Sequence, residues 1–595
     1  MERLKPTDVV IVGGGWTGLT MAKEITHRTA LSVVVLERGP GRKMADYGSA
    51  MDEVDYSLRF RMMQNIAEET VTHRHTLRDT AVPIRQYGAF LPGTGVGGSG
   101  EHWTGFAERH AEDDFKLATE MKQRFSAARL PDNLSIQDYP LTYHDLEPYY
   151  WKVEQMMGVG GKAGNLRGKI VEGGNPFEAP RAHEYPNPPH KMTWLMNVWT
   201  DAAKAVGYRP FPSPAATLTQ NYTNPDGISR GACQYCGYCM LYGCMVGAKA
   251  QPTNTLLPLL KPKKSFTLRT DSWARRIVHR DGKAEGVEYM DADGKQVMQP
   301  ASIVIVASFT QNNSRLLLLS GIGDKYDAAT GKGSLGKNFT HTVGGPGGAT
   351  IFFDKPLNNF MNAGGQAMRF ADFDGFRGID PDAGVLRGGQ GVGGGAGGGH
   401  PIAAFGRVPA GEVSRNWGSD WKKAALKYYD RIGSGGNFEM DHLAYKHNYL
   451  DLDPTYTDKW GDPLLRLTID WTDHENNQRQ MAAKISTKIA QQMARATGGR
   501  LIPAESGGLR ASKRYQTAAY ATTHLQGGTI MGSSPDDSVV NSWQQHWRVP
   551  NLFVVGASSF PQNSAAHPTL TAVALTLRTA DAMIDRYVRR PEVLL

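Results

Sequence analysis

A run of apolar residues near the N-terminus gives the clearest structural pattern in the chain. Residues 8–12 are Asp-Val-Val-Ile-Val, and a β-branched apolar run of this length is typical of a buried strand in a parallel sheet. The run leads into a glycine-rich turn at residues 13–18, and a helix is predicted to begin near Thr17. A second apolar run, residues 32–36, ends in Glu37. The pattern therefore predicts a strand, a tight turn, a helix and a second strand of one sheet.

Glycines at particular positions of this turn suit the binding of an adenine dinucleotide. Gly13 allows a sharp turn, Gly15 lets a pyrophosphate approach the backbone, and Gly18 lets the helix pack closely. Glu37 lies about twenty residues further on, where a carboxylate accepts hydrogen bonds from ribose hydroxyls. The fingerprint predicts a dinucleotide site, but it does not separate NAD from FAD.

The C-terminal region repeats the same kind of pattern. Residues 551–557 form another apolar run that ends in a glycine turn, and Pro568 opens an apolar helix that is expected to reach about Ile584. The last part of the chain therefore returns to the sheet that the first part begins.

Parts of the chain that alternate buried strands with helices are separated by parts richer in aromatic residues, prolines and polar turns. The pattern predicts a discontinuous dinucleotide-binding domain made of residues 1–54, 221–345 and 525–595, with a loop at 88–105. A substrate domain is predicted from residues 106–220 and 346–524. The segment 387–399 is mostly glycine and is expected to be a surface loop, with a mobile lid as the alternative.

The four cysteines of the chain all lie in segment 233–244, which is assigned to the dinucleotide domain; they are Cys233, Cys236, Cys239 and Cys244. Thiols this close in sequence can converge on one metal–sulfide core, so the spacing predicts an iron–sulfur cluster. A [3Fe-4S] cluster is the first expectation and a [4Fe-4S] cluster the alternative. A zinc site and two disulfides are competing interpretations, although zinc usually takes cysteine pairs from separate turns and disulfides between such close thiols would be strained. The spacing leaves open which cysteines bind iron.

Composition and charge fit a large enzyme. A chain of 595 residues and 65.1 kDa exceeds one ordinary core, so two domains are expected. The net charge of +8 could attract an anionic substrate, a partner or a membrane, but a solvated basic surface explains it as well. No basic run with interleaved aromatic residues predicts nucleic-acid binding. With no apolar run long enough for a membrane helix and no signal peptide, membrane attachment or export is expected to come from a partner.

The C-terminal stretches 551–557 and 568–571, together with residues 316–323 (Leu-Leu-Leu-Leu-Ser-Gly-Ile-Gly), resemble the glucose–methanol–choline (GMC) oxidoreductases, whose cofactor is FAD. Further motifs are similar to the large flavoprotein subunit of bacterial membrane-bound gluconate dehydrogenases: residues 88–93, 97–103, 233–244 and 449–456. The relatives that oxidise 2-ketogluconate, fructose and sorbitol are the runners-up. The resemblance implies an α/β protein of the GMC fold, with a discontinuous Rossmann-like FAD-binding domain and an α+β substrate domain built on an antiparallel sheet.

The resemblance also implies which residues hold FAD. They are Gly13, Gly15, Gly18, Glu37, Gly97, Gly98, His102, Trp103, Gly556, Ala557, Pro568 and Thr569. Small residues in the flavin loop, 88–105, let the backbone pass close to the isoalloxazine. His102 lies where some relatives attach FAD covalently, so a covalent bond through His102 and simple packing of its ring are both open. Asn312, Ser314 and Asn338 match further family positions and are expected to be structural.

Two histidines match the catalytic positions of the family. Removal of the hydroxyl proton during alcohol oxidation needs a base, and histidine is suited to it. The resemblance makes His524 the base and His567 its hydrogen-bond partner. Gluconate dehydrogenases usually have asparagine at the second position, so His567 is a departure from that group.

The expected activity is the oxidation of a secondary alcohol in a sugar or sugar acid, with gluconate to 2-ketogluconate as the first choice. FAD takes two electrons and can release them singly to a cluster. The resemblance implies transfer to a multihaem cytochrome c subunit and the quinone pool, a small chaperone-like subunit, and a place at the periplasmic face of the membrane after export with a partner. A cytoplasmic flavoprotein, a sugar oxidase with a structural metal, and a scaffold without chemistry are the alternatives.

Overall fold

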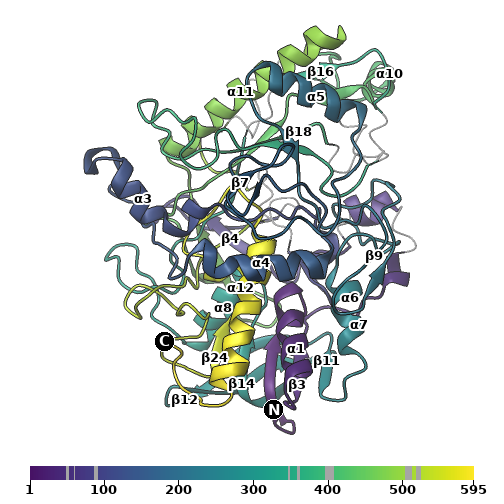
Figure 1. The fold of residues 1–595 in the computed structure, drawn as a ribbon. Coiled ribbons are helices and arrows are strands. Elements are labelled where there is room, and N and C mark those ends of the chain that lie inside the picture. The colour runs from purple at the N-terminus through teal and green to yellow at the C-terminus, as the bar shows by residue number, and fades with distance from the viewer. Residues whose placement is uncertain are drawn as a thin grey trace.

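The computed structural model describes residues 1–47, 52–58, 61–85, 92–345, 349–357, 362–395, 408–409, 411–502, 512–517 and 524–595. Residues 88–91 of the predicted flavin loop and 396–399 of the glycine-rich segment lie outside these ranges. The expectation of a surface loop at 387–399 is wrong for Gly389–Gly393, which form a strand of a sheet, where glycine lets the backbone lie close to the ring of Phe370. In Figure 1 one large sheet with its helices lies at the bottom, near both termini, and a second layer with the long helix α11 lies at the top.

The larger sheet contains eight strands, which come from three distant parts of the chain. Its strands are β1 (Glu2–Arg3), β2 (Thr7–Val12), β3 (Val33–Leu36), β11 (Phe266–Arg269), β12 (Trp273–Arg280), β13 (Lys283–Met290), β14 (Gln296–Val306) and β24 (Leu552–Val554). The strands β11, β3, β2, β14 and β24 run parallel, whereas β13 and β12 add an antiparallel edge. The predicted apolar runs therefore pair side by side, as buried parallel strands do.

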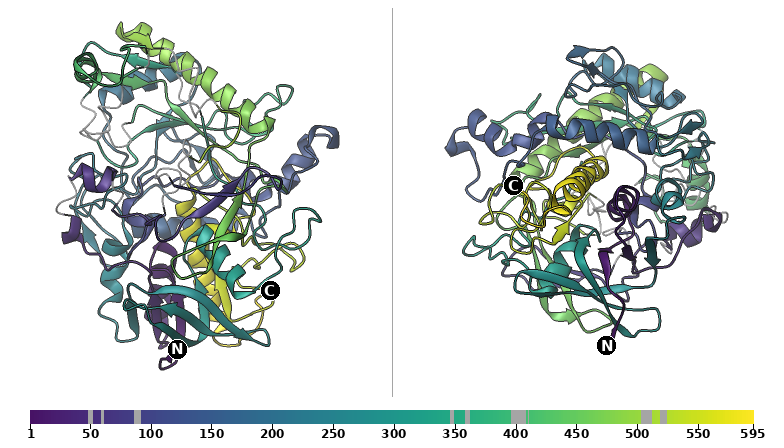
Figure 2. Two further views of the ribbon diagram at one scale, coloured as in Figure 1. Left: turned by 180° about the vertical axis from the view of Figure 1, so that it is seen from behind. Right: turned by 60° about the horizontal axis from the view of Figure 1, so that its bottom comes forward.

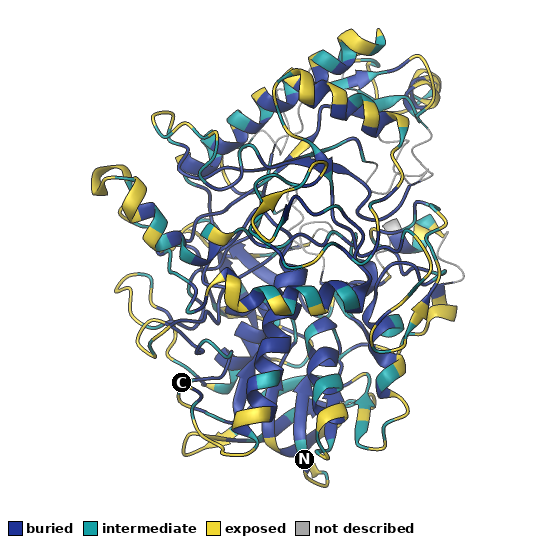
Figure 3. Ribbon diagram, viewed as in Figure 1, coloured by how far each residue is buried: buried dark blue, intermediate teal, exposed yellow. Residues whose placement is uncertain are grey.

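Two helices from opposite ends of the chain pack together on this sheet. They are α1 (Trp16–Arg28) and α12 (Pro568–Ala582), and in the right view of Figure 2 both lie between α4 (Tyr143–Met157) and the sheet. Because helices and sheet surround it, α12 is buried along almost its whole length, as Figure 3 shows. The helix predicted to reach Ile584 ends as an α-helix at Ala582 and continues in a wider turn, Met583–Tyr587.

The second layer is built on a five-stranded antiparallel sheet: β8 (Phe211–Pro212), β17 (Met368–Phe370), β18 (Gly389–Gly393), β20 (Asn437–Met440) and β15 (Val343–Gly344). The helix α11 (Asp473–Thr497) packs on β15 and β20, and it also contacts α5 (Trp194–Ala205). A capping box at Thr472 begins α11, and the left-handed Gly498 ends it.

The remaining elements are short or connect the layers. The other strands are β4 (Val71–Arg74), β5 (Val82–Pro83), β6 (Asn165–Leu166), β7 (Lys169–Ile170), β9 (Tyr222–Thr223), β10 (Ser229–Arg230), β16 (Thr350–Phe352), β19 (Ile432–Ser434), β21 (Tyr449–Thr457), β22 (Pro463–Thr468) and β23 (Arg500–Ile502). The other helices are α2 (Ser99–His102), α3 (Leu117–Arg124), α6 (Pro252–Thr255), α7 (Leu257–Leu260), α8 (Thr310–Ser320) and α10 (Ser419–Tyr428). The mixed α/β content with several sheets confirms the predicted fold class, while the residue boundaries between the domains stay a prediction. Within the described ranges, no helix is both long enough and apolar enough to cross a membrane.

Candidate active site and cofactor cavity

A cavity of about 310 Å³ lies at the carboxyl ends of the parallel strands. Val12, Leu36, Ala307 and Val555, which end or follow β2, β3, β14 and β24, all line it. Ligands of open α/β sheets bind at this edge, so the cavity is the candidate functional site.

Every predicted cofactor or catalytic residue except Gly18 lines this cavity. The lining residues among them are Gly13, Gly15, Glu37, Gly97, Gly98, His102, Trp103, His524, Gly556, Ala557, His567, Pro568 and Thr569. Asn312 also lines it, whereas Ser314 and Asn338 do not. The fold thus brings one predicted set together from four distant parts of the chain.

The glycine turn is shaped by close backbone contacts. Gly13 has φ +105°, and a Cβ there would lie 2.4 Å from the carbonyl oxygen of Ala307. A Cβ on Gly18 would lie 2.0 Å from the carbonyl oxygen of Gly13, so Gly18 sets the distance between α1 and the turn instead of lining the cavity. Gly15 has open space beside it, since the nearest atom to its Cβ position is the Gly97 oxygen at 3.8 Å. The turn leaves room for a pyrophosphate at Gly15.

Glu37 is buried at the end of β3, and backbone N–H groups surround its carboxylate. Oε2 accepts a hydrogen bond from Gly14 N at 2.9 Å, while Oε1 accepts from Gly39 N at 3.0 Å and Gly95 N at 3.2 Å. Burial raises the pKa of Glu37, and these hydrogen bonds oppose that rise. Oε2, which accepts one hydrogen bond, keeps a further lone pair with which a ribose hydroxyl could bond.

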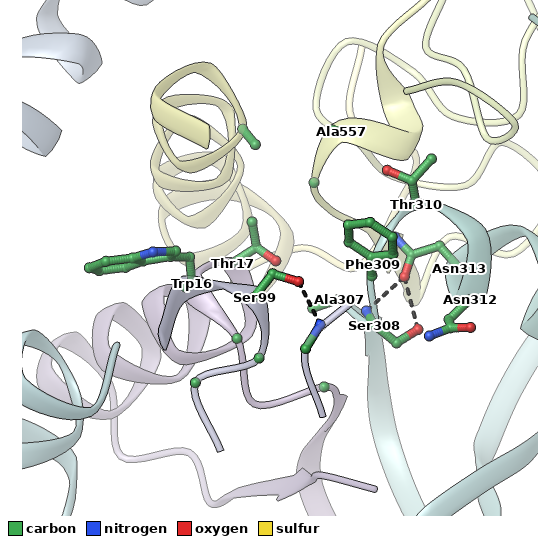
Figure 4. A pocket seen from close by; sticks show the side chains of 18 of the residues that line it. Trp16, Thr17, Ser99, Ala307, Ser308, Phe309, Thr310, Asn312, Asn313 and Ala557 are labelled. Carbon is green, nitrogen blue, oxygen red and sulfur yellow. Dashed lines mark hydrogen bonds between the residues drawn. The ribbon is translucent and has the colours of Figure 1, made fainter. Parts of the chain in front are cut away.

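Three helices of more than ten residues begin at the cavity without a side chain that caps them: α1, α8 and α12. Figure 4 shows Trp16 and Thr17 at the start of α1 opposite residues 307–313 at the start of α8. The first N–H groups of a helix lack partners within it, and the helix dipole adds positive charge there. The cavity wall is therefore suited to an anionic ligand such as a pyrophosphate.

A group of charged residues that the sequence did not predict lies at one end of the cavity. Arg38 and Arg315 both form ion pairs with Glu69, and Arg315 Nη2 lies 2.8 Å from Asp458 Oδ2. Arg38, Glu69 and Arg315 line the cavity. They belong to none of the recognised motifs, so no local signal in the sequence distinguishes them from ordinary surface charges.

The two predicted catalytic histidines lie next to each other, with ring centroids 4.3 Å apart. Among the described residues, no hydrogen-bond partner is found for the ring of His524. Burial, and then the neighbouring His567, lower the pKa of His524 to about 3, so its imidazole is neutral near pH 7. A neutral ring that lines the cavity can accept a proton.

His567 has charged partners that the sequence analysis did not predict. Its Nε2 donates a hydrogen bond of 2.8 Å to Glu439 Oε1, and its Nδ1 lies 3.5 Å from Glu108 Oε2. Arg369 is fully buried and pairs with both carboxylates, at 2.7 Å from Glu108 and 2.8 Å from Glu439. Arg369, followed by His567, holds the pKa of Glu439 well below its usual range.

The flavin loop lies against α1. Gly97 (φ +96°) and Gly98 (φ +54°) turn the chain, and a short helix, α2, follows and contains His102. His102 is buried and lines the cavity, which is compatible with both of its predicted roles. Trp103 Nε1 donates to Ala250 O at 2.8 Å, and the Trp103 ring meets Trp16 edge-on at 6.0 Å.

The cysteine segment lies directly beside this loop. Met240 and Leu241, between Cys239 and Cys244, line the cavity, and Leu241 N donates to His102 O at 2.9 Å. The thiols are free; Cys233 and Cys236 are half-buried, and Cys239 and Cys244 are buried. Burial raises the pKa of Cys233 to about 11 and that of Cys239 to about 12.

Two thiol sulfurs accept backbone hydrogen bonds: Cys233 Sγ from Tyr235 N at 3.3 Å and Cys239 Sγ from Gly364 N at 3.1 Å. Within the part of the chain that the structure describes, no group of three or more His, Cys, Asp or Glu side chains is arranged to hold a metal ion. The structure thus brings the cysteine segment to the cavity through Met240 and Leu241, but the four cysteines do not line it and do not by themselves form the predicted metal site.

A buried lysine connects the cysteine segment to the flavin loop. Lys249 Nζ donates to the carbonyl oxygens of Trp103 at 2.8 Å, Cys239 at 2.7 Å and Tyr242 at 2.9 Å. Arg230 is also buried nearby, and it donates to Met157 O at 2.6 Å. Over the described ranges, neither cation has a carboxylate at ion-pair distance. The positive charge of Lys249 favours a negatively charged Cys239 sulfur, although the effect of burial on the pKa of Cys239 is larger.

Comparisons with known proteins agree with this geometry. Two family models described as GMC oxidoreductase match residues 181–343 and 444–576. The chain is 37% identical to the gluconate 2-dehydrogenase flavoprotein of Pantoea cypripedii, over 99% of this chain and 95% of that protein. It is 25% identical to the fructose dehydrogenase large subunit of Gluconobacter japonicus, over 97% of this chain and 98% of that subunit. The solved structure of formate oxidase from Aspergillus oryzae RIB40, studied for its FAD modification, has a TM-score of 0.61 at 14% identity, covers 99% of each chain and shows the same fold.

Proposed function

Since the chain belongs to the GMC oxidoreductase family, we propose that it is a dehydrogenase that oxidises a secondary alcohol of a sugar or sugar acid, with gluconate as substrate and 2-ketogluconate as product. The observation that carries the proposal is the full-length similarity to a gluconate 2-dehydrogenase flavoprotein, together with two adjacent histidines in the cavity. 2-Ketogluconate, fructose, sorbitol and glucosides are the alternative substrates.

The cavity fits FAD, which the family uses as its cofactor. The start of α1 and Gly15 suit the pyrophosphate, Glu37 suits the ribose, and the flavin loop with the start of α12 would hold the isoalloxazine. When bound, FAD supplies the hydride acceptor for the alcohol carbon.

The protein's own residues handle the proton. His524 is neutral, lines the cavity and has no hydrogen-bond partner among the described residues, so it takes the hydroxyl proton of the substrate. His567 lies beside His524 and is held in place by Glu439. The uncapped start of α12 favours negative charge that develops near it during the reaction.

We further propose that the four cysteines hold an iron–sulfur cluster, [3Fe-4S] or [4Fe-4S], which passes electrons singly to a cytochrome c subunit and the quinone pool. Support comes from the donor set of four sulfurs, the contact of the cysteine segment with the cavity, and the link through Lys249. Loading would require the sulfurs to close around the cluster. A small chaperone-like subunit, a multihaem cytochrome partner and a place at the periplasmic face belong to this proposal through the resemblance alone. Covalent attachment of FAD through His102 is a further part of it.

The test is anaerobic mixing of the purified protein with gluconate, followed by visible absorption, low-temperature electron spin resonance and iron analysis. Bleaching of the flavin with a change in an iron–sulfur signal supports both proposals. A flavin that gluconate leaves oxidised rules out gluconate, and the alternative sugars are then tried. Oxygen uptake with peroxide formation and no iron would replace the relay with an oxidase. Denaturation in acid, followed by filtration, shows whether the yellow colour stays on the protein.

A further inference from the structure

Beside His524 lies a buried group of four side chains that we call the His567 quartet: Glu108, Arg369, Glu439 and His567. Its members come from the chain after the flavin loop, from β17, from β20 and from the residue before α12. The distances within it are 2.7 Å for Arg369–Glu108, 2.8 Å for Arg369–Glu439 and 2.8 Å for His567–Glu439. Since a carboxylate can only accept, the His567 Nε2 in this contact carries the hydrogen.

Both ring nitrogens of His567 face carboxylates, because Nδ1 lies 3.5 Å from Glu108 Oε2. Phe106 closes one side of the ring, with centroids 4.7 Å apart. The ring is therefore held by its partners in the protein, while His524 faces the cavity without such a partner among the described residues. In this geometry His567 is fixed by the protein, and His524 is available to accept a proton from the substrate.

The charged groups of the quartet act on His524 in opposite directions. Glu108 and Glu439 contribute two negative charges, and Arg369 contributes one positive charge. His567, whose ring touches that of His524, and Arg369 lower the pKa of His524, whereas the negative charge of Glu439 raises it. A buried negative charge at this distance acts strongly, because little water screens it.

We propose that Glu439 is a positioning residue for the oxidation: it holds His567 by its Nε2–H and places negative charge behind the histidine pair. The inference rests on the proposed alcohol oxidation. In that step the substrate O–H bond breaks and its proton moves to His524, while the C–H hydride, with its electron pair, leaves for FAD and a ketone remains. His524 becomes positive, and the negative charge of Glu439 offsets part of that charge.

The charged groups that face His567 are Glu108, Glu439 and Arg369, and His524 is its titratable neighbour. Beyond Arg369, Gln390 bonds to Asp374 at 2.9 Å and connects the quartet to the five-stranded sheet. Glu439 does not line the cavity, so it acts through His567 and not by touching the substrate.

The first test is Glu439→Gln, which keeps the shape of the side chain and removes its charge. Since Glu439 does not bind substrate, kcat for flavin reduction by substrate should fall about 10- to 100-fold, while KM changes less than about threefold. Reduction of the bound flavin by light and EDTA needs no base and should keep its rate. Glu439→Asp, which retains the charge, should recover part of kcat.

Glu475→Gln is the matched control. Glu475 is also buried and accepts a hydrogen bond from a histidine, His474 Nδ1 at 3.1 Å, but it does not line the cavity. If Glu439→Gln keeps kcat within twofold of the wild type, or if Glu475→Gln loses as much activity at equal thermal stability, the inference is overturned.

A second readout does not depend on activity. In protein with ¹⁵N-labelled histidine, the imidazole proton in the His567–Glu439 hydrogen bond should give a downfield resonance. That resonance should disappear in Glu439→Gln and in His567→Asn, but remain in Glu475→Gln. If no sugar or sugar acid reduces the wild type while this pattern holds, the proposed function fails and the placement of His567 stands. If Glu439→Gln leaves every such resonance in place, the placement itself is wrong.

Discussion

Different kinds of contact build the two ends of the cavity, the dinucleotide end and the histidine end. At the dinucleotide end, backbone groups dominate: Gly15 leaves open space, and the carboxylate of Glu37 is held by N–H groups of Gly14, Gly39 and Gly95. At the histidine end, the ion pairs of the His567 quartet bring together side chains from four separate segments.

The dinucleotide end is formed by residues close together in the sequence, whereas the histidine end is formed by residues far apart in the sequence. Gly13, Gly18 and Glu37 lie within one strand–turn–helix–strand unit, so short-range contacts build their geometry. Glu108, Arg369 and Glu439 are far apart in the sequence and meet only in the tertiary structure. We therefore expect a mutation at the histidine end to lower mainly the free energy of unfolding, and a mutation at the dinucleotide end to weaken mainly the retention of FAD.

The largest effect is expected from Arg369→Met, which breaks the histidine end. Arg369 is fully buried, and its loss leaves Glu108 and Glu439 facing each other without a cation. The free energy of unfolding should fall by about 3–5 kcal/mol in urea titrations. Arg28→Met, which removes partly exposed ion pairs with Asp581 and Asp585, is the control and should change it by less than about 1 kcal/mol. Equal effects of the two changes would contradict the contrast.

Gly18→Ala tests the dinucleotide end. Its Cβ would lie 2.0 Å from the Gly13 carbonyl oxygen, so α1 must shift away from the turn. We expect about 1–3 kcal/mol of overpacking strain, seen as roughly 10- to 100-fold weaker FAD retention by absorbance and dialysis. Gly41→Ala is the matched control, because its Cβ meets only Thr270 at 3.8 Å. Unchanged flavin content in Gly18→Ala would show that the turn tolerates the shift.

The two ends should respond to pH in opposite directions. The pKa of His524 is lowered to about 3, so the unfolded chain binds a proton below about pH 6.5 that the folded protein does not, and stability falls as the pH drops from there towards 3. The pKa of Glu37 is raised, so its contribution is present below the ordinary carboxyl pKa and is lost as the pH rises through the raised value. Thermal unfolding from pH 4 to 8 should show a shallower acid decline in His524→Gln than in the wild type. Superimposable curves would exclude His524 as a source of that decline.

The smallest effect is expected from Ser99→Ala in the flavin loop. Ser99 Oγ accepts a hydrogen bond from Gly93 N at 2.8 Å, which Figure 4 shows beside the cavity. Removing one such bond should lower stability by about 1 kcal/mol and raise the FAD dissociation constant several-fold. Fluorescence of released flavin measures the change, with Ser126→Ala, on a short helical turn away from the cavity, as the control.

Much of the dinucleotide end could be predicted. Residues 8–12 and 32–36 were expected as strands, and the structure has strands at Thr7–Val12 and Val33–Leu36. Gly13, Gly15 and Glu37 line the cavity as expected, whereas Gly18 supports it from behind. The roles assigned to these residues, to the two histidines and to the four cysteines stay predictions.

The missed residues share one property: none has a local pattern. Glu108, Arg369 and Glu439 are single charges, and charged residues in a sequence are far more often at the surface than buried. Glu69 and Arg315, at the other end of the cavity, are 246 residues apart in the chain. Which residues they pair with depends on how the two layers of the protein pack together, and the sequence alone does not give this packing.

The sequence by itself determined the apolar strands, the glycine turn, the family and the candidate histidines, because strand periodicity and backbone freedom are properties of neighbouring residues. Only the tertiary structure decided that His524 has no bonded partner among the described residues, that His567 is held by Glu439, and that the cysteine segment touches the flavin loop. Burial and ion pairing depend on which distant segments of the chain lie in contact. In a low-dielectric interior, these contacts determine which side chains stay charged.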